Sequence, residues 1–100
     1  MNKITVLQSD EFRDWLHRLR DSRANARIVS RIRRMELGNP GEVRQLGGGL
    51  VEMKIDYGPG YRAYFLHQEE SIILLLCGGD KSTQRRDIDR ARKLAETLRR

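Results

Sequence analysis

Residues 51 to 65 alternate between apolar and polar side chains on both sides of a Gly-Pro-Gly sequence, and this pattern restricts the fold more than any other feature. Successive side chains of a strand point to opposite faces, so Val51, Met53 and Ile55 would share one buried face. Pro59 fixes its own φ, and the glycines on either side of it tolerate the conformations that a chain reversal needs. The stretch therefore predicts a β-hairpin with one core face and one charged face.

The charged face of this hairpin would bring Glu52 and Lys54 close to Arg62 and Tyr64. Such a set suits cleavage of RNA by its own 2′-hydroxyl, a reaction that needs a base, a charge clamp and an acid. Glu52 or Lys54 could be the base, and Arg62 the clamp for the transition state. Lys81 could reinforce the clamp, with Tyr64 as a proton donor or stacking surface. The alternative is a set of cross-strand ion pairs on an exposed sheet, worth about 0.2–1 kcal/mol each.

Two amphipathic helices are predicted between a first edge strand, Lys3 to Leu7, and the hairpin. Ser9 can cap the first helix, whose apolar stripe runs from Phe12 to Leu19. A second stripe runs from Ala24 to Met35, and Gly38 can end that helix. We expect the two helices to form an antiparallel pair on one face of the sheet.

The apolar run from Ile72 to Cys77 predicts a central strand that is covered on both faces. A short strand, Val43 to Leu46, precedes the hairpin, and Ser82 or Thr83 can cap a last helix with a narrow apolar stripe. This order of elements predicts a single α+β domain over residues 1 to 100, with a mostly antiparallel sheet of about five strands. The second sheet face would stay partly open, with the last helix docking weakly or meeting a partner.

The formal net charge is +6, and the excess is concentrated in the helices. Residues 13 to 34 carry eight positive and two negative charges, and residues 81 to 100 carry eight and three. Guanidinium groups suit bidentate contacts to phosphate, so an anionic polymer is one partner that the charge favours. An equally weighted alternative is that these charges only form solvated helix faces and bind no polymer. For the arginines of the second helix this alternative is the favoured one. The candidate RNA-binding residues are Arg27, Arg31, Arg34, Arg85 and Arg86.

Other kinds of chemistry have little support in the sequence. His17 and His67 have no further ligand at metal-binding spacing, so neither a metal nor another cofactor is expected. Cys77 ends an apolar strand, where a thiol is usually inert packing. No apolar run approaches the roughly 20 residues of a membrane helix, and no secretion signal is visible at the N-terminus, so we expect a soluble cytoplasmic protein.

Several short sequence blocks carry a resemblance to a known protein family. GPGYR at positions 58 to 62 and GGDKSTQ at 78 to 84 are the most specific, and FRDWL and VEMKI extend the match over nearly the whole chain. With these residues the chain resembles the RelE/ParE superfamily of bacterial toxins, in particular its HigB-like branch of addiction module killer proteins. The resemblance implies a sheet flanked by an N-terminal helical pair, a cognate antitoxin, and cleavage of mRNA in the ribosomal A site.

The resemblance also implies roles for individual residues. Arg62 occupies the place of the arginine that many ribonucleases of the family use on the scissile phosphate, and Lys81 matches a basic residue after the central strand. Glu52 and Lys54 lie on the strand that supplies the base in different relatives. No histidine or tyrosine follows Lys81, where several relatives place an acid or a stacking ring.

Partners and alternatives follow from the same resemblance. The antitoxin is expected to be a helix-turn-helix DNA-binding protein, and operator DNA would be contacted only through it. Relatives of the ParE type inhibit DNA gyrase without being enzymes, and an inactive relative could retain antitoxin binding alone. For the ribonuclease, replacing Arg62 by alanine is expected to abolish growth arrest and leave the fold intact.

Overall fold

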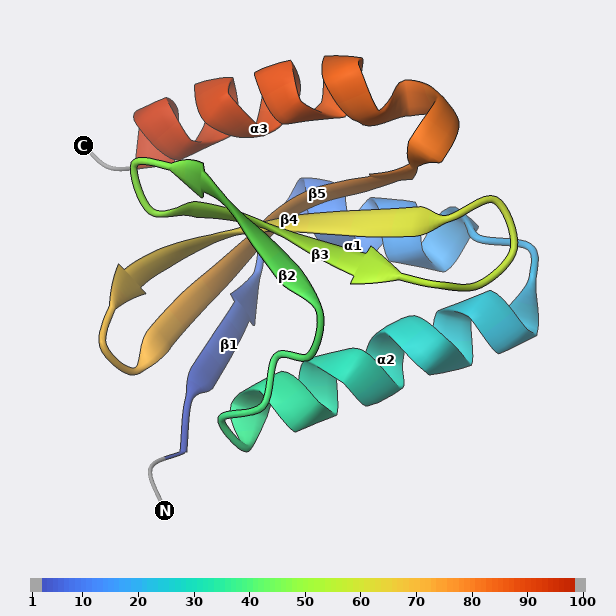
Figure 1. Ribbon diagram of the computed structural model, residues 1–100, viewed down its shortest axis with the longest axis horizontal. Coiled ribbons are helices and arrows are strands. Elements are labelled where there is room, and N and C mark those ends of the chain that lie inside the picture. Colours follow the sequence, from blue (N-terminus) through green and yellow to red (C-terminus); the bar gives the residue numbers. More distant parts are fainter. Residues whose placement is uncertain (1–2, 99–100) are drawn as a thin grey trace.

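The computed structural model describes residues 3–98 (Figure 1). Its five strands form one sheet in the order β1-β5-β4-β3-β2, in which β1 runs parallel to β5 and the other neighbours are antiparallel. This arrangement confirms the predicted α+β class with a mostly antiparallel sheet. The elements in chain order are β1 (Thr5–Gln8), α1 (Asp10–Arg18), α2 (Ser22–Glu36), β2 (Val43–Gly47), β3 (Leu50–Ile55), β4 (Tyr61–Glu69), β5 (Ile72–Asp80), the 3₁₀ turn η1 (Lys81–Thr83) and α3 (Gln84–Leu98).

The two N-terminal helices begin at side-chain caps. Ser9 accepts a hydrogen bond from the backbone N–H of Phe12, as predicted, and Asp21 accepts from the first turn of α2. Leu19 lies just beyond the end of α1, not within it, yet it still packs against the core. None of the helices within residues 3–98 is long and apolar enough to cross a membrane.

The α1–α2 layer covers one face of the sheet and encloses the larger core (Figure 1). The predicted apolar face of the hairpin lies here, with Met53 and Ala63 fully buried at paired positions of β3 and β4. Phe12 of α1 and Ile28 of α2 are equally buried. The alternation read from residues 51 to 65 is therefore confirmed on this side.

Helix α3 covers the opposite face, so the predicted open face and weak docking are wrong (Figure 1). Ala91 and Ala95 are buried against a second cluster that includes Tyr64, Leu66 and Leu76 of β4 and β5. Because alanine side chains are small, the helix axis can approach the sheet closely, and a narrow stripe is enough to exclude water. The sheet consequently has a core on each face.

The glycine pair at the end of β5 lets α1 and α3 approach this strand. A β-carbon on Gly78 would lie 2.4 Å from the Trp15 ring, and one on Gly79 would lie 1.8 Å from Oδ2 of Asp87. Asp80 then caps η1, and α3 begins at Gln84. The expected Ser82 or Thr83 cap of α3 is therefore wrong, because the chain first makes a 3₁₀ turn.

Candidate functional site: an arginine-lined pocket beneath the last helix

The charged face of the hairpin forms as predicted, and α3 covers its inner part. Glu52 of β3 pairs with Tyr64 of β4, and Lys54 pairs with Arg62, so all four side chains lie on the α3 side. Glu52, Lys54 and Arg62 border a pocket of about 200 Å³ between β2, β3, β4 and the start of α3, whereas Tyr64 lies outside its lining. The lining residues are Glu42, Val43, Arg44, Glu52, Lys54, Arg62 and Gln84.

Glu52 is at the centre of this pocket and is only 5% exposed. Its Oε2 accepts a hydrogen bond of 2.8 Å from Nε2 of Gln84 and lies 3.6 Å from Nε of Arg62. Its Oε1 lies 3.3 Å from Nε of Arg44. Two guanidinium groups and one amide therefore surround a single buried carboxylate, which compensates the loss of its hydration.

Arg62 is a buried cation with unused hydrogen-bonding capacity. It is 8% exposed, and its Nη1 donates to the carbonyl of Gly60 at 3.0 Å. Its Nε makes no hydrogen bond within residues 3–98, because the 3.6 Å to Glu52 is too long. Removing this side chain would leave Glu52 with less compensation in a buried position. The expectation that alanine at position 62 leaves the fold undisturbed is therefore revised: we now expect a loss of stability.

Tyr64 is too deeply buried to stack on a nucleobase. Its ring is fully buried beneath α3, and its hydroxyl makes no hydrogen bond within the described residues. Burial, and then the neighbouring Glu52 carboxylate, raise the pKa of this hydroxyl. In this conformation Tyr64 offers no face to a nucleobase, and a proton held there is released only reluctantly.

The two candidate lysines lie at the rim of the site. Nζ of Lys54 is 3.8 Å from Oε2 of Glu42, and its side chain is 42% exposed. Lys81 is exposed at the start of η1. A β-carbon on Gly60 would lie 3.4 Å from Nη1 of Arg62 and 3.5 Å from Cβ of Lys81, so the two basic residues flank the same glycine. Lys81 is thus near the clamp but outside the lining of the pocket.

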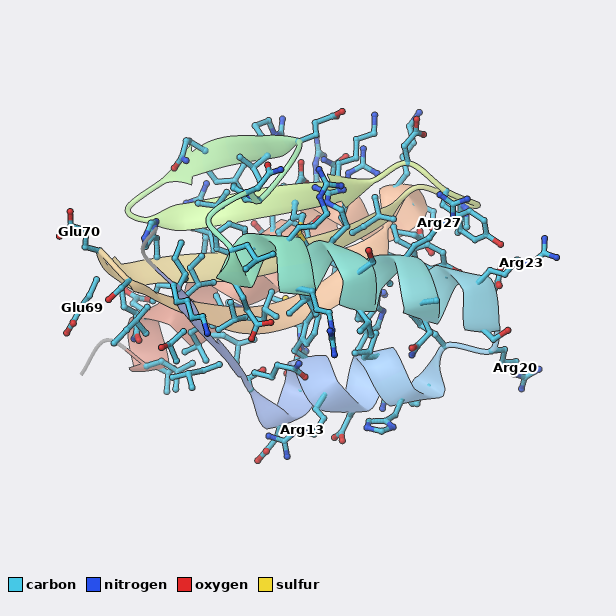
Figure 2. The ribbon with its side chains drawn as sticks, turned by 90° about the horizontal axis from the view of Figure 1, so that it is seen from below. Arg13, Arg20, Arg23, Arg27, Glu69 and Glu70 are labelled. Carbon is cyan, nitrogen blue, oxygen red and sulfur yellow. The ribbon has the colours of Figure 1, made fainter. Side chains whose placement is uncertain are left out.

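The arginines of α2 lie on the opposite layer from this pocket. Arg31 donates to the carbonyls of Lys54 and Pro40 at 2.6 and 2.9 Å, so its guanidinium joins α2 to the sheet and the preceding loop. Arg27 lies over the Tyr57 ring, with 4.6 Å from its guanidinium carbon to the ring centroid (Figure 2). Arg34 is exposed. Of these three predicted RNA contacts, Arg31 is already engaged with the protein backbone.

The basic surface of the helical pair is solvent-facing in Figure 2, where the labelled Arg13 of α1, Arg20 of the connecting loop and Arg23 of α2 point outward. On α3, Arg85 and Arg86 are both exposed, and Arg86 borders a different pocket beside α1. The candidate RNA-binding arginines therefore do not form one patch. Arg85 and Arg86 directly follow Gln84, the residue of α3 that contacts Glu52.

Sequence reasoning missed two residues of the site, Arg44 and Gln84. Arg44 pairs with Glu52 across β2 and β3, and the alternation of the short β2 segment could have indicated its direction. Gln84 is the first residue of α3 and reaches Glu52 only because η1 turns the chain back over the sheet. The sequence carried no local signal for that contact.

Cysteine chemistry finds no support at this site. Burial, and then Glu11, raise the pKa of the Cys77 thiol to about 12, so the reactive thiolate is scarce at neutral pH. Residues 3–98 also contain no group of three or more histidine, cysteine or acidic side chains arranged to hold a metal ion. The pocket itself presents carboxylates, guanidinium groups and the amine of Lys54.

Fold and site together define a small α+β protein in which two guanidinium groups and one amide lie around a buried carboxylate between the sheet and the last helix. Residues 14–98 match the family described as phage derived protein Gp49-like (DUF891), and the chain belongs to this family. It is also 46% identical over 95 residues to an uncharacterized protein of Haemophilus influenzae (strain ATCC 51907 / DSM 11121 / KW20 / Rd). That match covers 95% of this chain and 96% of the relative.

Proposed function

We propose that this protein is the toxin of a type II toxin-antitoxin system, a metal-independent endoribonuclease that cleaves mRNA on the ribosome and arrests translation. The observation that carries this proposal is the Glu52–Arg62 pair, a buried carboxylate and a buried guanidinium 3.6 Å apart beside an open pocket. A base and an oxyanion clamp held together in this way are what attack by a 2′-hydroxyl requires. Resemblance of GPGYR and GGDKSTQ to the RelE/ParE toxins points to the same reaction.

The chemistry would proceed within the RNA strand itself. Glu52 takes the proton of a 2′-hydroxyl, and the resulting oxygen attacks the adjacent phosphorus. The bond from phosphorus to the 5′-oxygen breaks, leaving a 2′,3′-cyclic phosphate on one fragment and a 5′-hydroxyl on the other. Arg62, which lines the pocket, would bind the phosphoryl oxygens as negative charge develops. The departing 5′-oxygen requires a proton, for which the exposed Lys54 is better placed than the buried Tyr64.

The size of the pocket supports this division of roles. About 200 Å³ is below the ~300–1,000 Å³ typical of sites that enclose a whole ligand. The pocket would therefore take the reacting phosphate and its ribose, while the bases are held outside it. On the ribosome, the message and the decoding site would hold those bases. Isolated RNA lacks that support, which favours activity that depends on the ribosome.

Inhibition by a cognate antitoxin is part of the same proposal. The pocket is bordered by Arg44, Lys54 and Arg62, so a protein segment with acidic side chains could occupy its mouth. Such a partner would neutralise the charge of Arg62 and at the same time keep RNA out of the pocket. Contact with operator DNA would then come from the antitoxin, as expected for a helix-turn-helix protein.

Controlled expression in bacteria tests the proposal. Wild-type protein should arrest growth, while Glu52→Gln and Arg62→Lys should relieve the arrest, because the first removes the base and the second removes the planar fork. Arg33→Lys, an exposed change on α2, is the matched control and should remain toxic. Continued arrest by both site variants, together with loss of DNA supercoiling activity in the cells, would instead favour gyrase inhibition. Absence of arrest by the wild type would favour an inactive relative.

A further inference from the structure

A second pocket lies on the other side of the first turn of α3. It has a volume of about 380 Å³ and is bordered by α1, the end of β5 and α3. Trp15 and Arg18 contribute from α1, Gly78 from β5 and Arg86 from α3. Unlike the Glu52–Arg62 pocket, its volume falls in the ~300–1,000 Å³ range of small-molecule sites. It is large enough for a nucleotide.

The charges of this second pocket favour an anion. Its two acidic residues are already engaged: Glu11 binds Arg90 through both oxygens, and Asp87 is 6% exposed and accepts a hydrogen bond from Thr83. The side chains of Arg18 and Arg86 are exposed and make no hydrogen bond or ion pair within residues 3–98. The lining carries three guanidinium groups and two carboxylates, a net charge of +1, and the guanidinium groups outside an ion pair, those of Arg18 and Arg86, match phosphate oxygens.

Trp15 gives the same pocket an aromatic wall. Its ring lies so close to the backbone of β5 that a β-carbon on Gly78 would be 2.5 Å or less from three of its atoms. Phe12 and Tyr61 hold it from the protein side, with ring centroids at 5.6 and 6.3 Å. A partly buried indole fixed in this way can receive a nucleobase without losing much side-chain freedom.

The two pockets are close enough for one strand of RNA. Gln84 borders the first and Arg86 the second, and residues two apart on a helix point about 200° from each other. The pockets are therefore separated by roughly one helix diameter, about 10 Å. Arg85 is exposed between these positions, and Arg62 pairs with Gly79, next to Gly78. An RNA strand that crosses the start of α3 would therefore pass Arg62, Arg85 and Arg86.

We propose that the pocket between α1 and α3 binds a nucleotide that flanks the scissile phosphate, with Arg18 and Arg86 on its phosphate and Trp15 against its base. This inference rests on the proposed function. It adds a second point of contact that sets the position of the strand relative to Glu52 and Arg62. Binding at this pocket can nevertheless be measured without cleavage.

Trp15 is the single tryptophan of the chain, so its fluorescence reports on this pocket directly. The probe is a 2′-O-methyl oligoribonucleotide of about ten nucleotides, which cannot undergo attack by a 2′-hydroxyl. We expect it to quench Trp15 in the wild type and in Arg62→Lys. The double variant Arg18→Ala/Arg86→Ala should bind about 10-fold more weakly, and its slope of log affinity against log salt should fall by about 1.4.

The control is Arg33→Ala/Lys93→Ala, which removes the same charge from exposed positions that border neither pocket. Equal weakening in both double variants would overturn the inference, since general charge would then explain binding. RNA binding without any change in Trp15 emission would also overturn it, as would quenching by an acidic peptide but not by RNA. Should the wild type bind and quench as expected yet cleave no RNA on or off the ribosome, the proposed function would fail while the pocket stands.

Discussion

Gln84 and Glu52 are 32 positions apart in the sequence and are joined by a hydrogen bond of 2.8 Å between Nε2 and Oε2. This bond fastens the first residue of α3 to the carboxylate that we propose as the base. The helix that closes the second core therefore also completes the site. A change in the docking of α3 would alter the surroundings of Glu52 directly.

The first prediction concerns this bond. Gln84→Ala should lower the free energy of unfolding by about 1–3 kcal/mol, because it leaves a buried carboxylate oxygen without its hydrogen-bond donor. Urea unfolding followed by circular dichroism measures the change. Arg85→Ala, on the exposed neighbouring position, should stay within about 0.5 kcal/mol of the wild type. Equal stability of the two variants would mean that Gln84 does not hold Glu52 in solution.

At Tyr64, by contrast, we expect that removing a polar group does not lower the free energy of unfolding. Its buried hydroxyl has no hydrogen-bond partner within the described residues, so Tyr64→Phe should leave stability unchanged or raise it by about 1 kcal/mol. Thermal unfolding measures this directly. The same variant should keep ribosome-dependent cleavage, because Lys54 and not Tyr64 is proposed as the proton donor. A large loss of cleavage in a stable Tyr64→Phe protein would assign the donor to Tyr64.

Because Gly79 lies in close contact with α3, we expect that adding a single methyl group there strongly lowers stability. Gly79→Ala would place a β-carbon 1.8 Å from Oδ2 of Asp87, so we expect a loss of about 3 kcal/mol or failure to fold. Gly38→Ala is the comparison, because no atom lies within 4 Å of its added carbon and only its positive φ is unfavourable, at about 1–2 kcal/mol. Similar costs at the two positions would argue against the tight packing of α3.

Cys77 predicts how stability depends on alkaline pH. The folded pKa of the thiol is about 12, above the ordinary value of about 8.5 that it regains on unfolding. The unfolded chain therefore loses this proton first, and stability falls as pH rises from about 8.5 toward 12. Between about pH 7.5 and 9.5 the wild type should lose roughly 1.4 kcal/mol more than Cys77→Ala does. Parallel pH dependence in the two proteins would contradict burial of the thiol.

The local pattern of the chain predicts much of this fold. Alternation across residues 51 to 65 identified the hairpin and its core face, because period-two patterns act within one strand. Ser9 at the start of α1 could be predicted for the same reason, since a cap needs only a few neighbouring residues. Glu52, Lys54, Arg62 and Tyr64 share a face because the turn fixes their register.

The position of α3 could not be read in the same way. Its apolar stripe is narrow, and the sequence does not show that Ala91 and Ala95 allow a close approach to the sheet. Burial of Tyr64 and the contact of Gln84 with Glu52 both depend on that approach. Local periodicity describes one element at a time, whereas these contacts depend on how two distant elements pack.

The most direct measurement of the central claim is primer extension on a message in an in vitro translation reaction, and on the same RNA without ribosomes. Wild-type protein should cut the ribosome-bound message only, and Glu52→Gln and Arg62→Lys should abolish the cuts while circular dichroism shows both variants folded. Identical cuts by the wild type and both folded variants would contradict the assignment of Glu52 and Arg62. No cuts by the wild type on either RNA would contradict the proposed ribonuclease.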